Sequence, residues 1–578
     1  MGWSARRWGH GVIAMSFVFL GAVLPARSAP ALDVRGQVGM GGWIVPGRFV
    51  PLRVQVGADR EVRGTLEVAV PGPGGDTVTH THAVHVTPGS AQQITFDIVV
   101  TDPRRDLLLR VRGNGGEEAR AAVPVGVFRV AEGIVAAVTR EPAGLEFLAA
   151  SGRKRRPAYL TGASLPSGWQ GYDAVDLVVV RDLDPRALLP VQQEALVGWV
   201  AQGGRLLVAA HDALPVPPWL QVLLPARIAS PPSSVPGVPV ALAALVPDPG
   251  AEVVRRGDRP LAVRGGFGRG VVEVWAFDPF SPQGRAWPGR LPLWRSLLEL
   301  PRPTPAASGT LADELPRTRP LPGSTQLVLA LLSVAYIAAI RILLRRFGPA
   351  RGGWVLLFAA VAAFGVVLFG VSAGARRAAG SIAQVSIIEV IPGAQRARAG
   401  TFVSLITPYG GRVDFTVPRG AAVRPLGPGN LRIDESESVV TGTARTGQGV
   451  LEVTQIVPVD LRAEAVERDG TLALVVTGRD PRPTHALLYR RRQIHRLGEE
   501  LHPRTVLDPA RWEPVDRPGT LGTDLAARAA EWLFKQLQAA GGEAWLVGRS
   551  SDERVGVRLP DGRSGISAQL VVIPVRLR

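Results

Sequence analysis

Acidic side chains and one histidine directly follow several predicted strands between residues 172 and 280. These residues are Asp182, Asp184, His211, Asp212 and Asp278. In an open α/β sheet, ligands bind beyond the carboxyl ends of the strands, so the five side chains could line one cleft. Carboxylates and imidazole can hold a divalent cation or hydrogen-bond the hydroxyl groups of a sugar. We assign these residues as a ligand-binding site, and we assign no catalytic residue, metal or cofactor.

The competing interpretation of the same residues is structural, and the pattern favours it. Asp-Pro pairs stand at 184–185 and 278–279, and an aspartate in such a pair commonly shapes a turn or caps a helix. A second group, His80-Thr-His-Ala-Val-His85, places His80 and His82 on one face of a predicted strand, because side chains two residues apart point the same way. A metal site there is the alternative to an exposed strand face, which the pattern favours.

The composition excludes several kinds of chemistry. The chain has 578 residues, is 46% hydrophobic and 20% charged, and carries a formal net charge of +17. It contains no cysteine, which rules out disulfides, thiolate metal sites and a cysteine nucleophile. The sequence also has no phosphate-binding P-loop, no Ser-His-Asp pattern and no HExxH zinc motif. The apolar composition favours a part that is embedded in a membrane.

Three apolar segments predict how the chain meets that membrane. Residues 1–29 combine a basic start, a short apolar run and small residues, which is typical of a secretory signal peptide; the alternative is an uncleaved anchor helix. The segments 324–345 and 352–375 are each long enough to cross the hydrocarbon layer as a helix. The sequence therefore predicts a hairpin of two transmembrane helices.

The connection between the two predicted helices is short and carries Arg345, Arg346 and Arg351. A short basic loop favours the cytoplasmic side of a membrane. Arginines also flank the opposite ends of the two segments, and the predicted signal peptide decides between the two orientations. We expect a multi-pass protein of the cytoplasmic membrane whose large regions lie on the extracytoplasmic side.

The regions outside these segments differ in their patterns. Residues 30–128 alternate apolar and polar residues between Gly, Pro and Asp turns, which predicts a β-sandwich. Residues 129–305 alternate short apolar strands with a helical pattern, which predicts a parallel sheet covered on both faces. Residues 306–323 are rich in Pro, Thr and Arg and are assigned as a linker. The C-terminal region 380–578 returns to β patterning, with one amphipathic helix at 524–540.

Three motifs of the region 129–305 occur together. They are Tyr172-Asp-Ala-Val-Asp-Leu-Val-Val-Val-Arg-Asp-Leu-Asp184, Gly203-Gly-Arg-Leu-Leu-Val208 and Gly266-Phe-Gly-Arg-Gly-Val-Val-Glu-Val-Trp-Ala-Phe-Asp278. This set resembles the class I glutamine amidotransferase-like fold, and the order of parts along the whole chain is similar to that of uncharacterised bacterial envelope membrane proteins. The resemblance implies a flavodoxin-like α/β domain in an envelope protein, and it supplies no established activity.

The chain departs from the amidotransferases at their nucleophile. Those enzymes use a cysteine at a sharp strand-to-helix turn, whereas the comparable strand end here reads Ala209-Ala-His-Asp-Ala213. Because the chain has no cysteine, it is not a functional glutamine amidotransferase. The resemblance therefore implies a fold that is kept for binding or for structure.

The expected function follows from location and architecture. We expect a membrane-anchored extracytoplasmic protein with a non-catalytic amidotransferase-like domain, acting as an interaction or accessory component of an envelope or transport assembly. The alternatives are an envelope hydrolase and a carbohydrate or small-ligand binding protein that uses the cleft of the α/β domain, with Trp43, Trp169 or Trp275 as stacking platforms. The expected partners are the lipid bilayer and other envelope membrane proteins, and no nucleic acid is expected.

Overall fold

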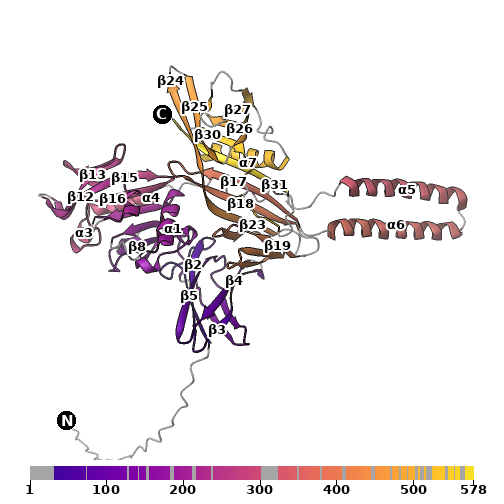
Figure 1. Ribbon diagram of the computed structural model, residues 1–578, viewed down its shortest axis with the longest axis horizontal. Coiled ribbons are helices and arrows are strands. Elements are labelled where there is room, and N and C mark those ends of the chain that lie inside the picture. The colour runs from indigo at the N-terminus through magenta and orange to yellow at the C-terminus, as the bar shows by residue number, and fades with distance from the viewer. Residues whose placement is uncertain are drawn as a thin grey trace, which may run out of the picture.

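The computed structural model describes most of the chain from residue 32 onward. The described residues are 32–72, 75–126, 129–140, 142–150, 155–181, 188–210, 216–235, 238–300, 311, 315, 323–347, 351–377, 381–406, 412–427, 429–443, 449–468, 471–480, 483–490, 493–500, 505–507, 513–515, 524–540, 544–551, 554–559 and 566–577. The predicted signal peptide 1–29 and most of the predicted linker 306–323 lie outside them. Strands dominate the described chain, as Figure 1 shows.

The N-terminal lobe is a β-sandwich, as its alternating pattern predicts. One sheet contains β1 (Leu32–Val38), β2 (Phe49–Ala58) and β5 (Ser90–Val99), and the other contains β3 (Val62–Pro71), β4 (Thr77–Val86), β6 (Leu107–Gly113) and β7 (Glu118–Val123). Every second side chain of β5, from Ile94 through Phe96 to Ile98, is buried. These side chains and their counterparts from the facing sheet form the core of the sandwich.

Strands from much later in the chain extend the second sheet of this sandwich. β21 (Asn430–Asp434) pairs with β4 in parallel, and β22 (Val439–Thr443) and β19 (Arg412–Thr416) continue the sheet beyond it. The N-terminal lobe therefore includes a segment that follows it by about three hundred residues. Sequence periodicity does not indicate this pairing, because periodicity identifies strands but not their partners.

The middle lobe is built on a mixed sheet. Five strands run parallel in the spatial order β9, β8, β10, β11, β16, and the antiparallel strands β15 and β14 follow β16 at one edge. The bounds are β8 (Gly133–Val138), β9 (Arg155–Leu160), β10 (Val175–Val180), β11 (Arg205–Ala209), β14 (Glu252–Arg256), β15 (Arg259–Phe267) and β16 (Gly270–Trp275). The described part of the lobe also contains a separate hairpin and α-helices: β12 (Ala226–Val235), β13 (Val238–Pro247), α1 (Pro190–Ala201), α2 (Pro218–Gln221), α3 (Pro282–Ala286) and α4 (Arg290–Glu299).

The expectation of a flavodoxin-like α/β domain is wrong. A doubly wound fold of that kind has a crossover helix after nearly every strand, and here the described parts of the first two crossovers contain only short 3₁₀-helices, Glu146–Ala150, Gly162–Ser164 and Trp169–Tyr172. The crossover from β11 to β16 contains β strands and the four-residue helix α2. The physical reason lies in the connecting segments, since Gly, Pro and Ser in 161–174 favour turns over helix.

The C-terminal lobe is a large β structure with one helix against it. Its strands are β17 (Ser381–Val390), β18 (Arg396–Ile406), β20 (Ala422–Pro425), β23 (Gly449–Pro458), β24 (Asp460–Arg468), β25 (Thr471–Asp480), β26 (Thr484–Arg490), β27 (Gln493–Glu500), β28 (Thr505–Leu507), β29 (Glu513–Val515), β30 (Ala544–Arg549) and β31 (Ile566–Leu577). The helix α7 (Asp524–Ala540) buries one face, including Leu525, Leu533 and Leu537, in a cluster with residues of β17 and β31.

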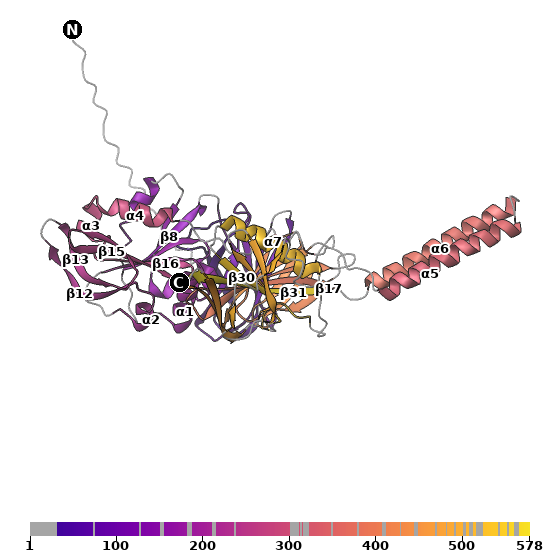
Figure 2. The same ribbon diagram turned by 90° about the horizontal axis from the view of Figure 1, so that it is seen from above.

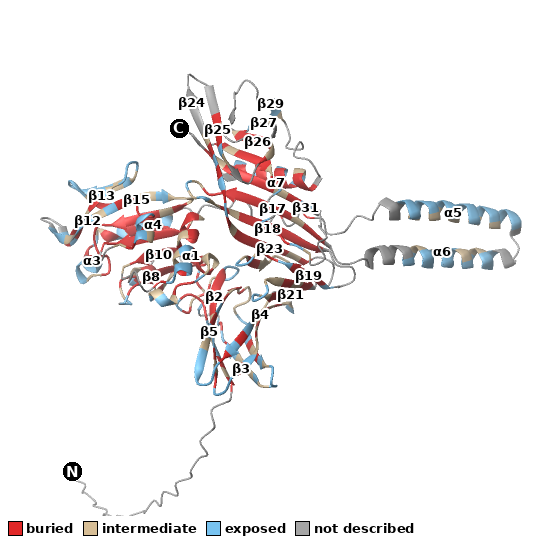
Figure 3. Ribbon diagram, in the orientation of Figure 1, coloured by how far each residue is buried: buried red, intermediate tan, exposed pale blue. Residues whose placement is uncertain are grey.

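A long helical hairpin extends away from the three lobes (Figures 1 and 2). Its limbs are α5 (Gly323–Phe347) and α6 (Arg351–Arg377), and the rings of Tyr336 and Phe364 stack between them with centroids 4.0 Å apart. Figure 3 shows the described side chains of the hairpin as mostly exposed.

The expectation of two transmembrane helices is wrong for this hairpin. Among the described residues, only α5 has an apolar stretch long enough to cross a membrane, Leu327–Arg346 with 20 residues. The apolar stretch of α6, Trp354–Gly370, is shorter. At 1.5 Å per residue it extends over about 25 Å, whereas the hydrocarbon layer is about 30 Å thick. One helix, and not two, has the required length.

The three lobes share one hydrophobic core. A single buried cluster includes residues of the N-terminal sandwich, of the mixed sheet and of the C-terminal strands, for example Phe96, Leu196 and Val453. An ion pair of 2.8 Å between Arg269 and Glu389, both largely buried, joins the mixed sheet to the C-terminal lobe. The segments before and after the helical hairpin are therefore parts of one folded body.

Candidate functional site

The structure places only one of the five predicted site residues. Asp182, Asp184, His211 and Asp212 lie outside the described residues, so their expected convergence stays a prediction. Asp278 is described, and it stands in the turn after β16, as the sequence predicts. Its side chain is largely buried.

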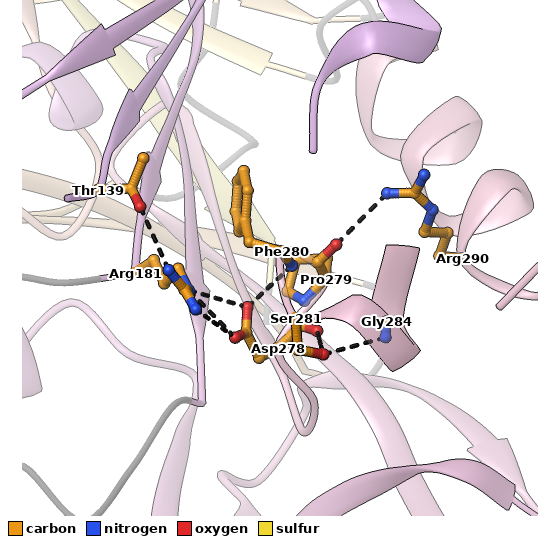
Figure 4. Close-up of polar contacts among 8 residues, drawn as sticks. All are labelled: Thr139, Arg181, Asp278, Pro279, Phe280, Ser281, Gly284 and Arg290. Carbon is orange, nitrogen blue, oxygen red and sulfur yellow. Dashed lines mark hydrogen bonds and ion pairs between the residues drawn. The ribbon is translucent and has the colours of Figure 1, made fainter. Parts of the chain in front are cut away.

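Asp278 is held in an ion pair (Figure 4). Arg181, which follows β10, places one terminal guanidinium nitrogen 3.0 Å from Asp278 Oδ2 and its Nε 3.2 Å from Oδ1. Asp278 Oδ1 also accepts a hydrogen bond of 2.8 Å from the backbone N–H of Phe280. The Arg181 guanidinium reaches Thr139 Oγ1, 3.5 Å away, after the end of β8. The carboxylate therefore fastens the ends of parallel strands together and shapes its own turn, which agrees with the structural interpretation.

The tryptophans proposed as stacking platforms are mostly packed inside the protein. Trp275 is fully buried, stacks on Phe277 with centroids 5.2 Å apart, and donates its indole N–H to Glu273 at 2.6 Å. Trp43 and Trp169 are half-buried and pack against the same core. Core packing accounts for Trp275, which cannot receive a sugar ring in this position.

The three histidines of β4 do not form a metal centre. His80 is buried and its Nδ1 lies 2.9 Å from Glu435 Oε1, while His85 Nε2 lies 2.9 Å from Glu61 Oε1 on the surface. His82 shares the face of His80, since both rings make T-shaped contacts with the ring of Phe96. Within the described part of the chain, no group of three His, Asp or Glu side chains is arranged to hold a metal ion.

A cavity of about 180 Å³ opens where the three lobes meet. It is lined by side chains of β4 and β5, by the 3₁₀-helix Trp169–Tyr172 of the middle lobe, and by the later segment 417–438. The polar side chains at its wall include His80, Asp97, Gln170, Asp434 and Glu435. We call this space the junction cavity.

Asp97 is the most perturbed group in the wall of the junction cavity. Its Oδ1 atom is shielded from solvent and has no hydrogen-bond partner among the described residues. Burial, reinforced by the negative charge of Glu435, raises the pKa of Asp97 from 3.8 to about 7. Burial also raises the pKa of Tyr172, and the nearby charge of Asp97 adds to that effect. With a pKa of about 7, the Asp97 carboxyl group binds or releases a proton near neutral pH.

Two glycines make room for the Asp97 carboxyl group. A Cβ atom at Gly168 would lie 2.6 Å from Asp97 Oδ2, and one at Gly171 would lie 2.9 Å from Oδ1. The same position at Gly168 is 3.0 Å from Gln170 Oε1, so Asp97 Oδ2 and Gln170 Oε1 both lie close to Gly168. Gln170 Oε1 is also buried without a hydrogen-bond partner among the described residues. Asp97 Oδ1 and Gln170 Oε1 are therefore two buried acceptors beside the cavity, and both are shielded from solvent.

Asp173 holds the lobes together next to the junction cavity. Its carboxylate accepts hydrogen bonds from the Arg48 guanidinium at 3.1 Å, the Phe49 backbone N–H at 3.1 Å and the Arg424 guanidinium at 2.9 Å. Arg424 also lies over the ring of Phe49, 4.8 Å from its centroid. One side chain of the middle lobe thus binds both the N-terminal sandwich and the C-terminal segment.

Sequence reasoning did not identify the junction cavity. Its polar groups come from residues 97, 170 and 435, which no local pattern connects. The one signal in the sequence was a charged residue, Asp97, inside a strand of alternating apolar residues. That signal is weak by itself, because the polar face of a half-buried strand normally carries such residues.

Comparisons with known proteins cover part of the chain. Residues 31–126, the N-terminal sandwich, match a family model described as a domain of unknown function, DUF8726. No glutamine amidotransferase family model matches, and no curated protein matches the chain. The amidotransferase resemblance therefore stays a prediction.

Solved structures resemble the chain only distantly. An exo-beta-1,4-mannosidase, Op5Man5 from Opitutaceae bacterium strain TAV5, is 18% identical over 28% of this chain and 34% of the mannosidase, with a TM-score of 0.20. The chain thus spans about a third of the length of that enzyme. A cycloisomaltooligosaccharide glucanotransferase from Paenibacillus sp., complexed with cycloisomaltoheptaose, is 11% identical over 74% of this chain and 72% of its own, with a TM-score of 0.16. Scores this low support no argument about function.

Proposed function

We propose that this protein is a membrane-anchored extracytoplasmic protein that acts, without catalysis, as an interaction or accessory component of an envelope assembly. The observation that carries the proposal is the α5–α6 hairpin, which is apolar, exposed and separate from the folded body. The lobes then serve as a platform that the hairpin holds beside a lipid bilayer.

The surface of the hairpin supports insertion into lipid. Most of the large apolar side chains that are exposed in the described chain lie on it, among them Leu331, Val334, Val355, Phe358 and Phe369. Water-exposed apolar surface of this extent is unfavourable by roughly 25 cal/mol per Å². Contiguous apolar patches of that kind mark membrane or protein interaction sites. None of the apolar stretch of α5 is buried against the body, so lipid is the environment that satisfies it.

The connectivity of the body determines how the hairpin enters the bilayer. The chain before α5 and the chain after α6 share one core, and β21 pairs directly with β4. Both ends of the hairpin must therefore lie on the same side of the membrane. In our proposal the hairpin is embedded in the bilayer from the side of the body, through the exposed apolar surface of α5.

The predicted signal peptide at 1–29 favours the extracytoplasmic side for the body, and the arginines at the hairpin tip favour its insertion away from that side. The lack of cysteine excludes a thiol nucleophile, and the carboxylate of Asp278 is engaged with Arg181. The rival proposal, an envelope hydrolase, would need Asp278 to contact a substrate.

The absence of cysteine makes this proposal testable by labelling of single introduced thiols. Asp59, in the exposed turn between β2 and β3, is replaced in one variant (Asp59→Cys), and Arg346 at the hairpin tip in another (Arg346→Cys). Each is expressed in bacterial cells and treated with a membrane-impermeant maleimide. We expect the protein in the membrane fraction, with Asp59→Cys labelled in intact spheroplasts and Arg346→Cys protected until detergent dissolves the membrane.

Two results would contradict the proposal. Recovery of the intact protein in the soluble fraction without detergent would show that the hairpin does not anchor the protein in a membrane. Labelling of Asp59→Cys only after cell lysis would place the body in the cytoplasm. The unsubstituted protein serves as the control, because it has no thiol and must give no signal.

A further inference from the structure

We propose that the tip of the helical hairpin binds the headgroups of anionic phospholipids. The tip is defined by Arg341, Arg345 and Arg346 of α5 and by Trp354 of α6. The inference rests on the proposed function, because it names the kind of lipid that an embedded hairpin meets. It goes beyond that function, which a bilayer without net charge would also satisfy.

The charged side chains of the hairpin are all positive. Residues 323–377 contain no Asp, Glu or Lys, and their charged side chains are Arg341, Arg345, Arg346, Arg351, Arg376 and Arg377. The side chains of Arg341, Arg345 and Arg346 are exposed. The tip is the end of the hairpin that lies farthest from the described lobes (Figures 1 and 2). The negative charge that neutralises the tip therefore comes from the surroundings of the hairpin.

The position of these arginines matches the level of lipid headgroups. The apolar stretch of α5 runs from Leu327 to Arg346, and its 20 residues rise about 30 Å, which is about the thickness of the hydrocarbon layer. Arg345 and Arg346 therefore stand where that layer ends. Arg341 lies one turn before Arg345 on the same helix face. Its long apolar stem lets the guanidinium group reach the headgroups.

A tryptophan marks the same level on the second helix. α6 begins at Arg351, shortly after α5 ends at Phe347, so Trp354 in the first turn of α6 also lies at the tip. Its side chain is 53% exposed. Indole has an apolar body and a polar N–H group, and tryptophan is enriched where hydrocarbon meets headgroups. The tip thus combines two residue types that anchor a helix at a membrane interface.

Net charge decides between the possible headgroups. Phosphatidylcholine carries a phosphate and a quaternary ammonium group and has no net charge, whereas phosphatidylglycerol keeps the charge of its phosphate. Guanidinium groups bind phosphate oxygens through paired N–H donors, and clusters of arginine at a membrane surface attract anionic lipids. Arg345 and Arg346 also lie in the last turn of α5, where positive charge stabilises a helix end. That role alone would not distinguish one phospholipid from another.

Energy transfer from the tip to labelled lipids tests the proposal in the full-length protein. Leu344→Cys introduces the only thiol of the chain beside Arg345, and a maleimide donor dye is attached to it. The protein is reconstituted into vesicles of phosphatidylcholine with a minority of phosphatidylglycerol, and a trace of either lipid carries an acceptor dye on its acyl chain. We expect at least twofold more transfer to labelled phosphatidylglycerol than to labelled phosphatidylcholine. The preference should shrink in 1 M NaCl, where the Debye length is about 3 Å.

Two double variants in the Leu344→Cys background connect this preference to the tip. Arg345→Gln with Arg346→Gln removes two charges from the tip, and we expect it to reduce the preference for phosphatidylglycerol by at least half. Arg227→Gln with Arg419→Gln removes two exposed charges from the body and is the matched control, which should keep the full preference. Circular dichroism of both variants shows whether they are folded.

Flotation of the vesicles separates a failure of this inference from a failure of the proposed function. Protein that does not float with the vesicles has no membrane anchor, and both proposals are then overturned. Protein that floats but transfers energy equally to the two labelled lipids is anchored without selecting anionic headgroups, and only the present inference is overturned. The same conclusion follows if the folded variant Arg345→Gln with Arg346→Gln floats and keeps the full preference.

Discussion

At the scale of single residues, the burial of Asp97 predicts that the stability of the folded protein depends on pH. Its carboxyl group has no hydrogen-bond partner for Oδ1 among the described residues, and Glu435 adds a second negative charge nearby. The unfolded chain releases the Asp97 proton near its ordinary pKa of 3.8, whereas the folded protein keeps that proton up to about pH 7. Between these values the folded state binds more protons than the unfolded state, so the free energy of unfolding falls as the pH rises.

The variant Asp97→Asn should remove this contribution to the pH dependence. We expect the unsubstituted protein to lose stability between pH 4 and pH 8 relative to Asp97→Asn, by about 1.4 kcal/mol for each unit of pKa shift. Thermal or urea unfolding of both proteins in detergent across that range measures the difference. Parallel stability curves for the two proteins would show that Asp97 is not a buried, unpaired acid.

The Arg181–Asp278 pair is a second feature at this scale. Asp278→Ala leaves a largely buried guanidinium without its carboxylate and frees the N–H of Phe280. Removal of one partner of a buried pair costs about 3–5 kcal/mol, and we expect that loss in urea unfolding. Asp258→Ala, on the surface, should stay within about 0.5 kcal/mol of the unsubstituted protein. A folded Asp278→Ala protein of undiminished stability would contradict the structural role.

At the scale of elements, α7 shows how a local pattern becomes a packed unit. The apolar residues Leu525, Ala529, Leu533 and Leu537 recur every four residues, which brings them to one helix face. That face is buried against β17 and β31. The same helix leaves Lys535 exposed on its other side.

Substitution in this face should destabilise the C-terminal lobe. Leu533 is fully buried, so Leu533→Ala should lower the free energy of unfolding by about 2–5 kcal/mol through lost burial and the cavity that remains. Lys535→Ala is the matched control on the exposed face and should change stability little. Equal unfolding midpoints for the two variants would mean that α7 does not pack as described.

At the scale of the whole molecule, the body and the hairpin are separate structural units joined by the chain. None of the apolar stretch of α5 is buried, and the core that joins the lobes contains no hairpin residue. We therefore expect the hairpin to contribute little to the stability of the body.

Deletion of residues 323–377 with a short Gly-Ser replacement tests this separation. We expect the shortened protein to leave the membrane fraction and to remain monodisperse without detergent, because the main exposed apolar surface is gone. Its unfolding midpoint should match that of the full chain within a few degrees. Aggregation of the shortened protein, or its retention in membranes, would show that other surfaces of the body meet lipid.

The sequence indicated some parts of this architecture and missed others for identifiable reasons. Alternation of apolar residues predicted the N-terminal sandwich, and apolar runs such as Leu206–Val208 coincide with buried strands. The prediction of a flavodoxin-like domain was wrong because it placed helices in the segments that connect β8, β9 and β10. The segment between β9 and β10 is rich in residues that favour turns. The prediction of a second transmembrane helix was wrong because the apolar stretch Trp354–Gly370 is too short to cross a membrane.

What the sequence alone determined is local: the period of each strand and helix, the exclusion of thiol chemistry, and the positions of charged residues at strand ends. These follow from contacts between residues a few positions apart. Only the tertiary structure decided that β21 pairs with β4, that Asp173 joins three lobes, and that Asp97, Gln170 and Glu435 surround one cavity. Such groupings depend on the packing of segments that are distant in the sequence. Burial in that packing raises the pKa of Asp97, and the residues next to Asp97 in the sequence do not indicate this burial.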